Sequence, residues 1–521
     1  MEAFMKKNFL SVLALILSLC MLTLLCAACK TNDDHGNNST TTSSDNTGTL
    51  PPSEDHTHDF NRQKSSLNYV AEPATCKNSG WYYYSCACGE TGTQTFDSGD
   101  FATCKFENGI CKWCGKAEPT PTEGLVFTSI KNGEAYMLTG YTGSATEIYV
   151  PSTHNGKPVI RITAYVFKEN ANVTSVIIGD NILYIDNDAF ADCANLKSVT
   201  IGNDVKEIGE YAFGWCENLE SVNLPNTLTL IEKGAFWMCS SLLSVKIPYG
   251  VTQLGEDSFG RCDSLTSIFV PDTVTSIGRK AFSWCLKLEN IEVDPDNANY
   301  SSLQGNLYNK DQTTFLQYAM GKSDPDFVIP STVTTIGYYA FAYCESIVNL
   351  EIPNSVTNIA FYAFGEVSGM KYNTKDELNY LGNAENPYLF LVNAENKRIT
   401  TASVDDNCRF INDFAFSFCT SLTSVTFGEN SKLKAIGNSA FFYCGALESI
   451  TIPASVTSLY SPFYACTSLS SITFKNADNW YMTSTRDDFE NGVEGTPANV
   501  ADSAANVTNF METYNGAYWY K

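Results

Sequence analysis

The sequence predicts a repeat solenoid, a superhelix of stacked short coils, preceded by a small cysteine-rich module. Three observations lead to this fold class. A phenylalanine recurs every 23 residues through the centre of the chain. Two short apolar alternations flank each phenylalanine, a pattern typical of strands rather than of a long helix. A cysteine follows most of these phenylalanines after three residues. A fixed period of this length is the signature of a repeat architecture, in which each unit stacks on its neighbours.

The recurring phenylalanines form one uninterrupted run and a second, interrupted group. The run consists of Phe167, Phe190, Phe213, Phe236, Phe259 and Phe282. The second group consists of Phe341, Phe364, Phe416, Phe441 and Phe463. The cysteines at the shared position are Cys193, Cys216, Cys239, Cys262, Cys285, Cys344, Cys419, Cys444 and Cys466. Because a thin coil has room only for small apolar groups beside its phenylalanine, we expect these cysteines to be buried packing residues. Disulfides between neighbouring coils are the alternative.

The repeat unit is represented by residues 274–293, with the sequence VTSIGRKAFSWCLKLENIEV. Its second alternation, Leu-x-x-Val-x-Ile, is short and rich in β-branched residues, so it predicts a strand. Stacked coils place equivalent strands side by side at about 4.8 Å. We therefore expect a right-handed superhelix over residues 161–475, with a parallel β-sheet on its concave face.

Caps and insertions complete this part of the chain. Residues 124–160 contain short strand-like segments joined by Gly and Asn turns, and they predict an N-terminal cap. Residues 294–327 and 366–405 interrupt the period and alternate like hairpins. Residues 476–521 lose the repeat and end in the aromatic segment AYWYK. We expect this segment to cover the exposed sheet edge of the last coil.

Residues 1–29 are predicted to be a secretion signal, because two lysines precede an apolar stretch and two cysteines around two alanines close it. This ending resembles the lipobox of bacterial lipoproteins, which implies lipidation of Cys29 and an anchor in a bacterial membrane. The departure from that pattern is Cys26, where an aliphatic residue is usual. Plain secretion and an uncleaved membrane helix are the alternatives. Residues 30–55 are almost wholly Ser, Thr, Asn, Asp and Gly, and they predict a disordered polar tether.

Residues 56–118 form a cysteine-dense module with a twofold internal echo. Two close cysteine pairs are spaced like the half-sites of a zinc ribbon, and their four thiolates would suit one tetrahedral zinc ion. The four candidate ligands are Cys86, Cys88, Cys111 and Cys114. Three disulfides are one alternative, because Cys76 and Cys104 bring the total to six and a secreted chain can oxidise its thiols. Unpaired thiols, or a mixture of these states, are the other.

The composition excludes some functions and disfavours others. A formal net charge of −24 repels phosphate backbones, so we expect no nucleic-acid partner. Histidines are scarce and lie outside the regular repeats, which leaves little material for a catalytic Ser-His-Asp or Cys-His group. The four are His35, His56, His58 and His154. No phosphate-binding loop, zinc-protease motif or nucleophile elbow occurs. We therefore expect no enzyme and no cofactor in the solenoid.

The unit I-P-x-x-V-T-x-I-G-x-x-A-F-x-x-C-x-x-L-x-x-I resembles the BspA-like, or treponemal-type, leucine-rich repeats of bacterial surface proteins. The resemblance covers about residues 124–475. It implies a leucine-rich-repeat solenoid that is secreted or lipid-anchored and exposed at the cell surface. It further implies a non-enzymatic protein that adheres to host proteins, to extracellular-matrix proteins or to other bacteria. A structural scaffold that binds components of the bacterium's own envelope is the alternative function.

A binding surface is expected where strand residues point outward. Down the stack, the middle residue of Val-x-Ile varies in chemistry while its neighbours stay apolar. An aromatic side chain flanked by charges is a plausible anchor for a protein partner. The candidate ligand-binding residues are Lys246, Phe269, Glu292 and Glu351. The two insertions are the competing location for the binding site.

Overall fold

The computed structural model describes residues 62–64, 68, 70–72, 81–85, 91–97, 105–107, 109–485, 493–513 and 516–521. The predicted signal with Cys29, the polar tether, and the cysteines Cys86 and Cys88 lie outside the described residues. Within these ranges, no helix combines the length and the apolar character that a membrane crossing requires. The cysteine-rich module contains one antiparallel sheet of β1 (Val70–Glu72), β2 (Trp81–Ser85) and β3 (Thr91–Asp97), and one hairpin of β4 (Phe106–Glu107) and β5 (Ile110–Cys111).

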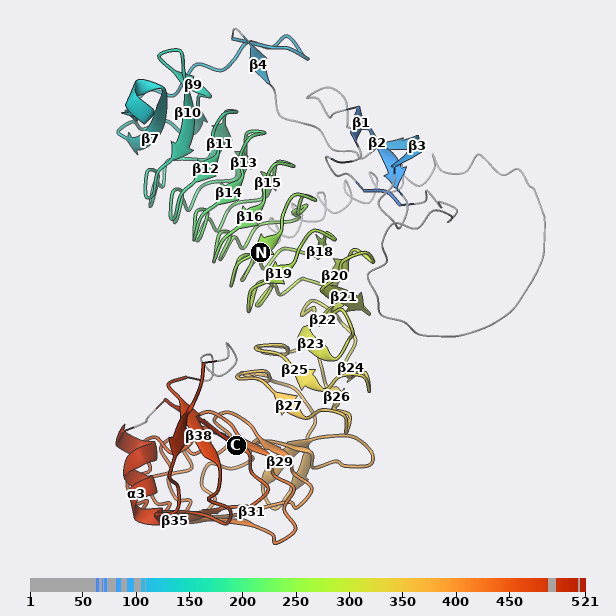
Figure 1. Cartoon of the computed structure of the whole chain (residues 1–521), viewed down its shortest axis with the longest axis vertical. Helices are drawn as coiled ribbons and strands as arrows, with labels where there is room; N and C mark the ends of the chain where they lie inside the picture. Colours follow the sequence, from blue (N-terminus) through green and yellow to red (C-terminus); the bar gives the residue numbers. More distant parts are fainter. Residues whose placement is uncertain are drawn as a thin grey trace, which may run out of the picture. The chain divides into compact units, whose positions relative to one another are not determined.

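The repeats form a solenoid of stacked coils, as predicted. Most regular coils contribute one strand to each of two faces, and the two strand series lie on opposite sides of the coils (Figure 1). We call the strands of the V-T-x-I segment face A. They are β12 (Tyr184–Ile185), β14 (Glu207–Ile208), β16 (Leu230–Ile231), β17 (Gln253–Leu254), β19 (Ser276–Ile277), β23 (Thr314–Gln317), β25 (Thr335–Ile336), β27 (Asn358–Ile359), β30 (Phe390–Ala394), β32 (Phe410–Ile411), β34 (Ala435–Ile436) and β36 (Ser458–Tyr460).

The strands of the Leu-x-x-Val-x-Ile segment form the other side, which we call face B. They are β11 (Ser175–Ile178), β13 (Ser198–Thr200), β15 (Ser221–Asn223), β18 (Ser267–Val270), β20 (Asn290–Val293), β24 (Asp326–Val328), β26 (Asn349–Glu351), β31 (Thr401–Val404), β33 (Ser424–Phe427), β35 (Ser449–Ile452) and β37 (Ser471–Phe474). Pairing within the regular repeats is parallel and joins equivalent residues of successive coils, such as Val176 with Val199 on face B. The sequence period therefore sets the strand register directly.

The recurring phenylalanines stack into an interior spine. The rings of Phe190 and Phe213 lie 5.1 Å apart and within 6° of parallel. Equivalent rings stack at 4.8–6.3 Å from Phe167 to Phe282. All of these side chains are almost completely buried. Offset stacking of this kind adds about 0.5–1.5 kcal/mol per pair to the free energy gained by burying the rings.

A tight turn around each spine phenylalanine connects face A to face B. In most coils, the residues two before and two after the phenylalanine have positive φ, for example Asp188 (φ 55°) and Asp192 (φ 57°) around Phe190. This conformation is unfavourable for residues with a side chain. Here it directs backbone N–H groups to the next coil: the amide of Asp188 donates to Glu210 O at 2.8 Å, and that of Asp192 donates to Gly214 O at 2.8 Å. The sequence pattern did not predict this backbone.

The N-terminal cap is built from β6 (Leu125–Ile130), a 3-10 turn η2 (Lys131–Gly133), β7 (Ala135–Tyr141), β8 (Glu147–Val150), β9 (Thr153–His154) and β10 (Lys157–Ile162). Strands β6 and β7 pair antiparallel, whereas β7 pairs parallel with β10 and so joins face A. Strand β8 pairs parallel with β11 and starts face B. The cap therefore begins both faces before the regular period starts.

The two insertions form antiparallel hairpins, as their alternation predicted. The first contains β21 (Tyr300–Leu303) and β22 (Asn306–Asn309), and the second contains β28 (Asn373–Lys375) and β29 (Leu378–Leu381). Each insertion also returns to the solenoid, because β23 and β30 pair parallel with the next strand of face A. Phe315 on β23 stacks on Phe341 at 4.6 Å and so continues the spine. Each insertion therefore contributes a strand to the solenoid itself.

The C-terminal cap comprises β38 (Trp480–Thr483), β39 (Thr496–Ala498), the helix α3 (Ser503–Thr508), a π-helical turn η3 (Asn509–Thr513) and β40 (Tyr518–Tyr520). Strand β40 pairs antiparallel with β36 and covers the last edge of face A, as the aromatic ending predicted. On face B, Asn506 of α3 donates to Ile472 O at 2.8 Å. Both faces of the last coil are therefore capped.

Candidate functional site

The cysteines of the repeats belong to the interior, as predicted. The Cys193 thiol donates to Phe167 O at 3.0 Å, and Cys216 donates to Phe190 O at 3.2 Å. Five further repeat cysteines bond in the same way to the spine residue of the preceding coil. Burial raises the pKa of the Cys193 thiol to about 12, so the reactive thiolate is scarce at neutral pH. The ten described cysteines from Cys193 to Cys466 are free thiols.

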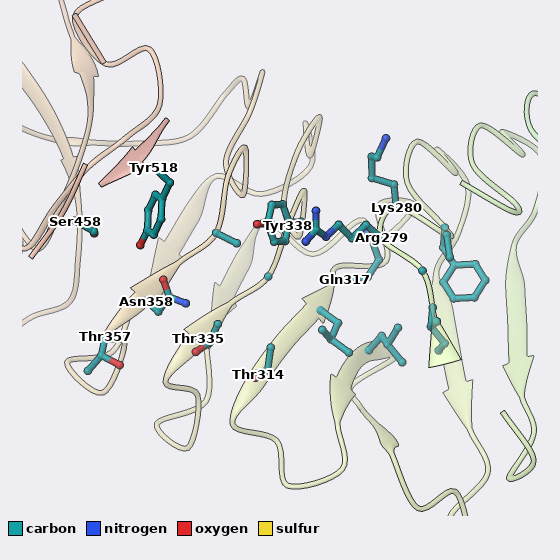
Figure 2. Close-up of a pocket in the computed structure, with 18 of the residues that line it drawn as sticks. Arg279, Lys280, Thr314, Gln317, Thr335, Tyr338, Thr357, Asn358, Ser458 and Tyr518 are labelled. Carbon is teal, nitrogen blue, oxygen red and sulfur yellow. The ribbon is translucent and has the colours of Figure 1, made fainter. Parts of the chain in front are cut away.

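A cleft of about 540 Å³ opens on face A (Figure 2). One wall carries the outward residues of consecutive strands, Thr314 on β23, Thr335 on β25 and Asn358 on β27. These side chains point outward because the next residue of each strand, such as Ile336, fills the interior. The stacked strands thus present a row of hydroxyl and amide groups to the cleft.

The opposite wall of the cleft comes from the end of the chain. Ser458 lies on β36, and Tyr518 and Tyr520 lie on β40. Near the cleft, the rings of Phe361 and Tyr460 contact each other at 6.2 Å, although almost one hundred residues separate them in sequence. The coils after the second insertion therefore approach the coils before it on the face A side.

A cation lies at the edge of the cleft. The Arg279 guanidinium stacks over the Tyr338 ring at 3.9 Å, and Figure 2 shows both side chains on the rim of the cleft. Stacked arginines keep edge N–H groups that suit planar, oxygen-rich partners. Tyr338 also fixes the arginine, so the guanidinium is preorganised.

Lys280 has the opposite environment. Its ammonium bonds to Asp257 at 2.9 Å and to Glu256 at 3.1 Å. Burial lowers the pKa of Lys280, but the two carboxylates outweigh burial and raise it above 10.5. The lysine charge is therefore neutralised locally, whereas the Arg279 guanidinium is held against the Tyr338 ring at the rim of the cleft.

The cleft lining contains no aspartate, glutamate, histidine or cysteine among the described residues. Its charged members are Arg279, Lys280 and Lys521. This is unusual in a chain with a net charge of −24. A neutral or acidic ligand would meet less electrostatic repulsion here than on the acidic remainder of the surface.

The predicted column lies on face B and does not line the cleft. Phe269 and Glu292 are paired in register on β18 and β20. Lys246 lies one coil before Phe269, in a segment that forms no regular strand. Glu351 lies on β26 beside Val328 of β24, so the first insertion separates it from the other three residues. The structure thus brings together Phe269 and Glu292 but not the complete set.

Glu351 contributes instead to a second cavity. This cavity of about 360 Å³ is lined by Val328, Glu351 and Glu385, and Val328 is 60% exposed. Glu385 belongs to the second insertion, so the two locations predicted for the binding site meet here. Sequence reasoning missed Val328 because it follows the first insertion, where the period is lost.

The structure describes two of the four candidate zinc ligands. Cys111 is buried and Cys114 is partly exposed, and their partners in the proposed site lie outside the described residues. Among the side chains that the structure places, no group of three or more His, Cys, Asp or Glu could hold a metal ion. His154 packs against the rings of Phe127 and Tyr136 in the N-terminal cap.

Sequence reasoning missed the cleft because it is assembled over long distances. The residues Thr314, Thr335 and Asn358 occupy equivalent strand positions, and this signal is present in the repeat. What the sequence does not contain is the approach of β40 to the coils near Arg279. Only the three-dimensional course of the chain shows which outward positions share a cavity.

Residues 160–289, 318–385 and 392–488 match the model of a BspA type leucine rich repeat region in six copies. No curated protein matches the chain. A leucine rich cell surface protein from Faecalibacterium prausnitzii has 29% identity and a TM-score of 0.42, and the match covers 70% of this chain and 97% of that protein. A leucine-rich repeat protein from Bacteroides ovatus has 23% identity and a TM-score of 0.38, over 68% of this chain and 88% of that protein.

Proposed function

Because the chain belongs to the BspA-type leucine-rich repeat family, we propose that it is a non-enzymatic surface protein that binds another protein. The observation that carries this proposal is the cleft on face A. Its volume of about 540 Å³ accommodates a segment of a partner rather than a large surface. The row of Thr and Asn groups offers hydrogen bonds, and Arg279 and Tyr338 offer a fixed anchor.

The composition of the cleft supports binding rather than catalysis. Bond-breaking chemistry usually needs a carboxylate, an imidazole or a thiol within reach of the ligand. The described lining supplies hydroxyl, amide and phenol groups and cations, without any of those three. Hydroxyl and amide groups suit a neutral or acidic polypeptide segment, which they hold by hydrogen bonds.

The predicted location follows from the N-terminal sequence. A secretion signal that ends at Cys29 would place the protein outside the cell with a lipid anchor, and residues 30–55 would act as a spacer. Labelling cells with radioactive palmitate tests this proposal. A Cys29→Ser variant should lose the label, whereas Cys26→Ser should keep it. Equal labelling of both variants would contradict the anchor at Cys29.

The binding proposal can be tested with the secreted chain of residues 30–521. Immobilised chain is titrated with purified host and extracellular-matrix proteins, and separately with purified envelope proteins of the producing bacterium. Replacement of Arg279 and Tyr338 by Ala should weaken binding of the true partner at least tenfold, because both side chains form the anchor. A partner from the host supports an adhesin, and a partner from the envelope supports a structural scaffold.

A matched control distinguishes the two faces. The Lys246→Ala and Phe269→Ala variant removes side chains of face B and should leave binding at the cleft unchanged. Deletion of residues 366–405 removes the second insertion and tests whether the partner binds there instead. If the face B variant abolishes binding while the Arg279 and Tyr338 variant does not, the partner binds the column of Lys246, Phe269, Glu292 and Glu351.

For the cysteine-rich module, we propose one zinc ion held by four thiolates, with three disulfides as the alternative. The cysteines of the proposed site are Cys86, Cys88, Cys111 and Cys114. Metal analysis of the chain purified under reducing conditions should give one zinc per chain, and Cys114→Ser should abolish it. Absence of zinc together with loss of six free thiols would favour the disulfides.

A further inference from the structure

Four aromatic side chains cluster on the surface of the C-terminal repeats. We call Phe418, Phe442, Tyr443 and Tyr464 the aromatic row. Phe418, Tyr443 and Tyr464 are 55%, 48% and 43% exposed. Large apolar side chains in contact with one another on a surface commonly mark a binding site.

The turn around the spine places these rings outside. Phe418 and Tyr443 occupy the positive-φ position two residues after Phe416 and Phe441, with φ of 61° and 58°. Their side chains are exposed, whereas the neighbouring spine rings are completely buried. Because the coils stack in register, equivalent outward rings come into contact.

The rings are held flat against each other across the coils. Phe418 and Tyr443 stack with centroids 5.4 Å apart and planes within 18°. Phe442 and Tyr464 stack at 5.7 Å and within 14°. Phe418 also meets the edge of Phe442 at 5.3 Å, which joins the two stacks. The row therefore presents connected ring surfaces across three coils.

A cavity of about 480 Å³ adjoins the row and shares Phe418 with it. The cavity lies beside the second insertion and is also lined by Tyr362 and Phe414. Cavities that bind small molecules have volumes of about 300–1,000 Å³. The row and the cavity can therefore contact one elongated ligand.

Polar groups line the same cavity. Asn393 and Asn412 contribute amides, and Glu366 contributes a carboxylate that accepts a hydrogen bond from the Tyr362 hydroxyl at 3.1 Å. The Asp413 carboxylate accepts from the Tyr362 backbone N–H at 2.6 Å, which fixes the Tyr362 backbone at the cavity wall. Rigid rings next to amides and carboxylates suit a ligand that has both apolar faces and hydroxyl groups.

We propose that the aromatic row and this cavity bind a neutral oligosaccharide. The C–H face of a sugar ring packs against an aromatic ring, and its hydroxyls bond to amides and carboxylates. The cavity carries two carboxylates, Glu366 and Asp413, against one ammonium, Lys397, so this excess and the net charge of −24 disfavour a negatively charged glycan. Residues beside the row, such as Ser417, Gly445 and Thr467, carry no charge. This binding is separate from the protein binding proposed for face A.

The test uses the secreted chain of residues 30–521 and a panel of neutral hexasaccharides of glucose, mannose, xylose and N-acetylglucosamine. Isothermal titration calorimetry should detect binding of at least one of them. Phe418→Ala and Tyr443→Ala should each raise the dissociation constant about tenfold, since each variant removes one stacking ring. The matched control is Tyr165→Ala, which removes a 60% exposed tyrosine at a positive-φ position of the first repeat. This control should bind normally.

Circular dichroism shows whether each variant stays folded, and exposed rings should cost little stability. The proposal is overturned if the wild-type chain binds no sugar of the panel, or if Phe418→Ala and Tyr443→Ala bind as well as the wild type. It is also overturned if these two variants convert a dimer to a monomer in light scattering, because the row would then join two copies of the chain.

Discussion

The repeats of residues 161–293 and those of residues 407–475 share one interior. In the first group, the rings of Phe213 and Phe236 stack at 5.4 Å, and in the second group those of Phe441 and Phe463 also stack at 5.4 Å. Cysteine thiols bond to the preceding spine carbonyl in both groups. The interior therefore repeats in geometry as well as in sequence.

Their exteriors differ at the turns around the spine. Positive-φ positions of the first group include Asp188, Asp257 and Lys280, which are charged, whereas the corresponding positions of the second group carry no charged residue. In the second group these positions are Phe414, Phe418, Ser439, Tyr443, Ser461 and Ala465. The turn backbone is the same in both groups, so the difference lies only in the side chains. The spine phenylalanines determine the structure of the coil. The positive-φ positions around them can carry different side chains and therefore different binding chemistry.

The largest expected effect tests whether the two interiors are equivalent. Phe236→Ala and Phe441→Ala should each lower the free energy of unfolding by about 3–5 kcal/mol, because each leaves a cavity in the ring stack. Both rings are fully buried, so the two losses should agree. Urea denaturation followed by circular dichroism measures them. A loss below about 1 kcal/mol in only one variant would show that the spines are not equivalent.

Thiol reactivity gives a second comparison of the interiors. Burial raises the pKa of both Cys285 and Cys466 to about 12, against an ordinary value of 9.0. At pH 8, alkylation of both thiols should be at least about a hundredfold slower in the folded chain than in urea. Mass spectrometry of iodoacetamide-treated chain identifies the modified residues. Fast labelling of Cys466 alone would show that the C-terminal repeats open independently.

The smallest expected effect concerns the charged exterior. Lys280→Met should cost about 1 kcal/mol at pH 8, because it leaves the buried Asp257 carboxylate without its ammonium partner. The pKa of Lys280 is raised in the folded chain, so its contribution is complete below pH 10.5 and is lost as the pH rises through the folded value. The wild type should therefore approach the stability of the variant above that pH.

Ser439 provides the matched control for this prediction. It occupies the position of Lys280 in the second group of repeats, and Ser439→Ala should change stability by less than about 0.5 kcal/mol at any pH. Thermal melts of both variants at pH 8 and pH 11 make the measurement. Equal pH dependence in the two variants would contradict a difference between the exteriors.

The spine and the strand series of face B could be predicted from the sequence because the signal is repeated many times, whereas the second strand series, face A, was not predicted. One phenylalanine in a single coil indicates little, but equal spacing from Phe167 to Phe282 requires equivalent environments. The AYWYK ending was also predictable, because the last coil must cover its edge. These features depend on local pattern and on contacts between neighbours along the chain.

Features that depend on distant contacts could not be predicted. The cleft requires β40 to approach the coils near Arg279, and no period in the sequence contains this information. The positive-φ turns were missed because residues such as Asp188 show no glycine at these positions. Phe418 and Tyr443 occupy equivalent positions in the sequence, but the pattern of inward residues does not indicate that these two side chains are exposed.

Both ends of face A consist of antiparallel strands, β6 with β7 and β40 with β36. Such ends do not continue the parallel register of the coils. A longer descendant of this protein would therefore arise by duplication of whole 23-residue units inside the array, where each copy meets identical neighbours above and below. Family members should accordingly differ in length by whole coils while retaining similar ends.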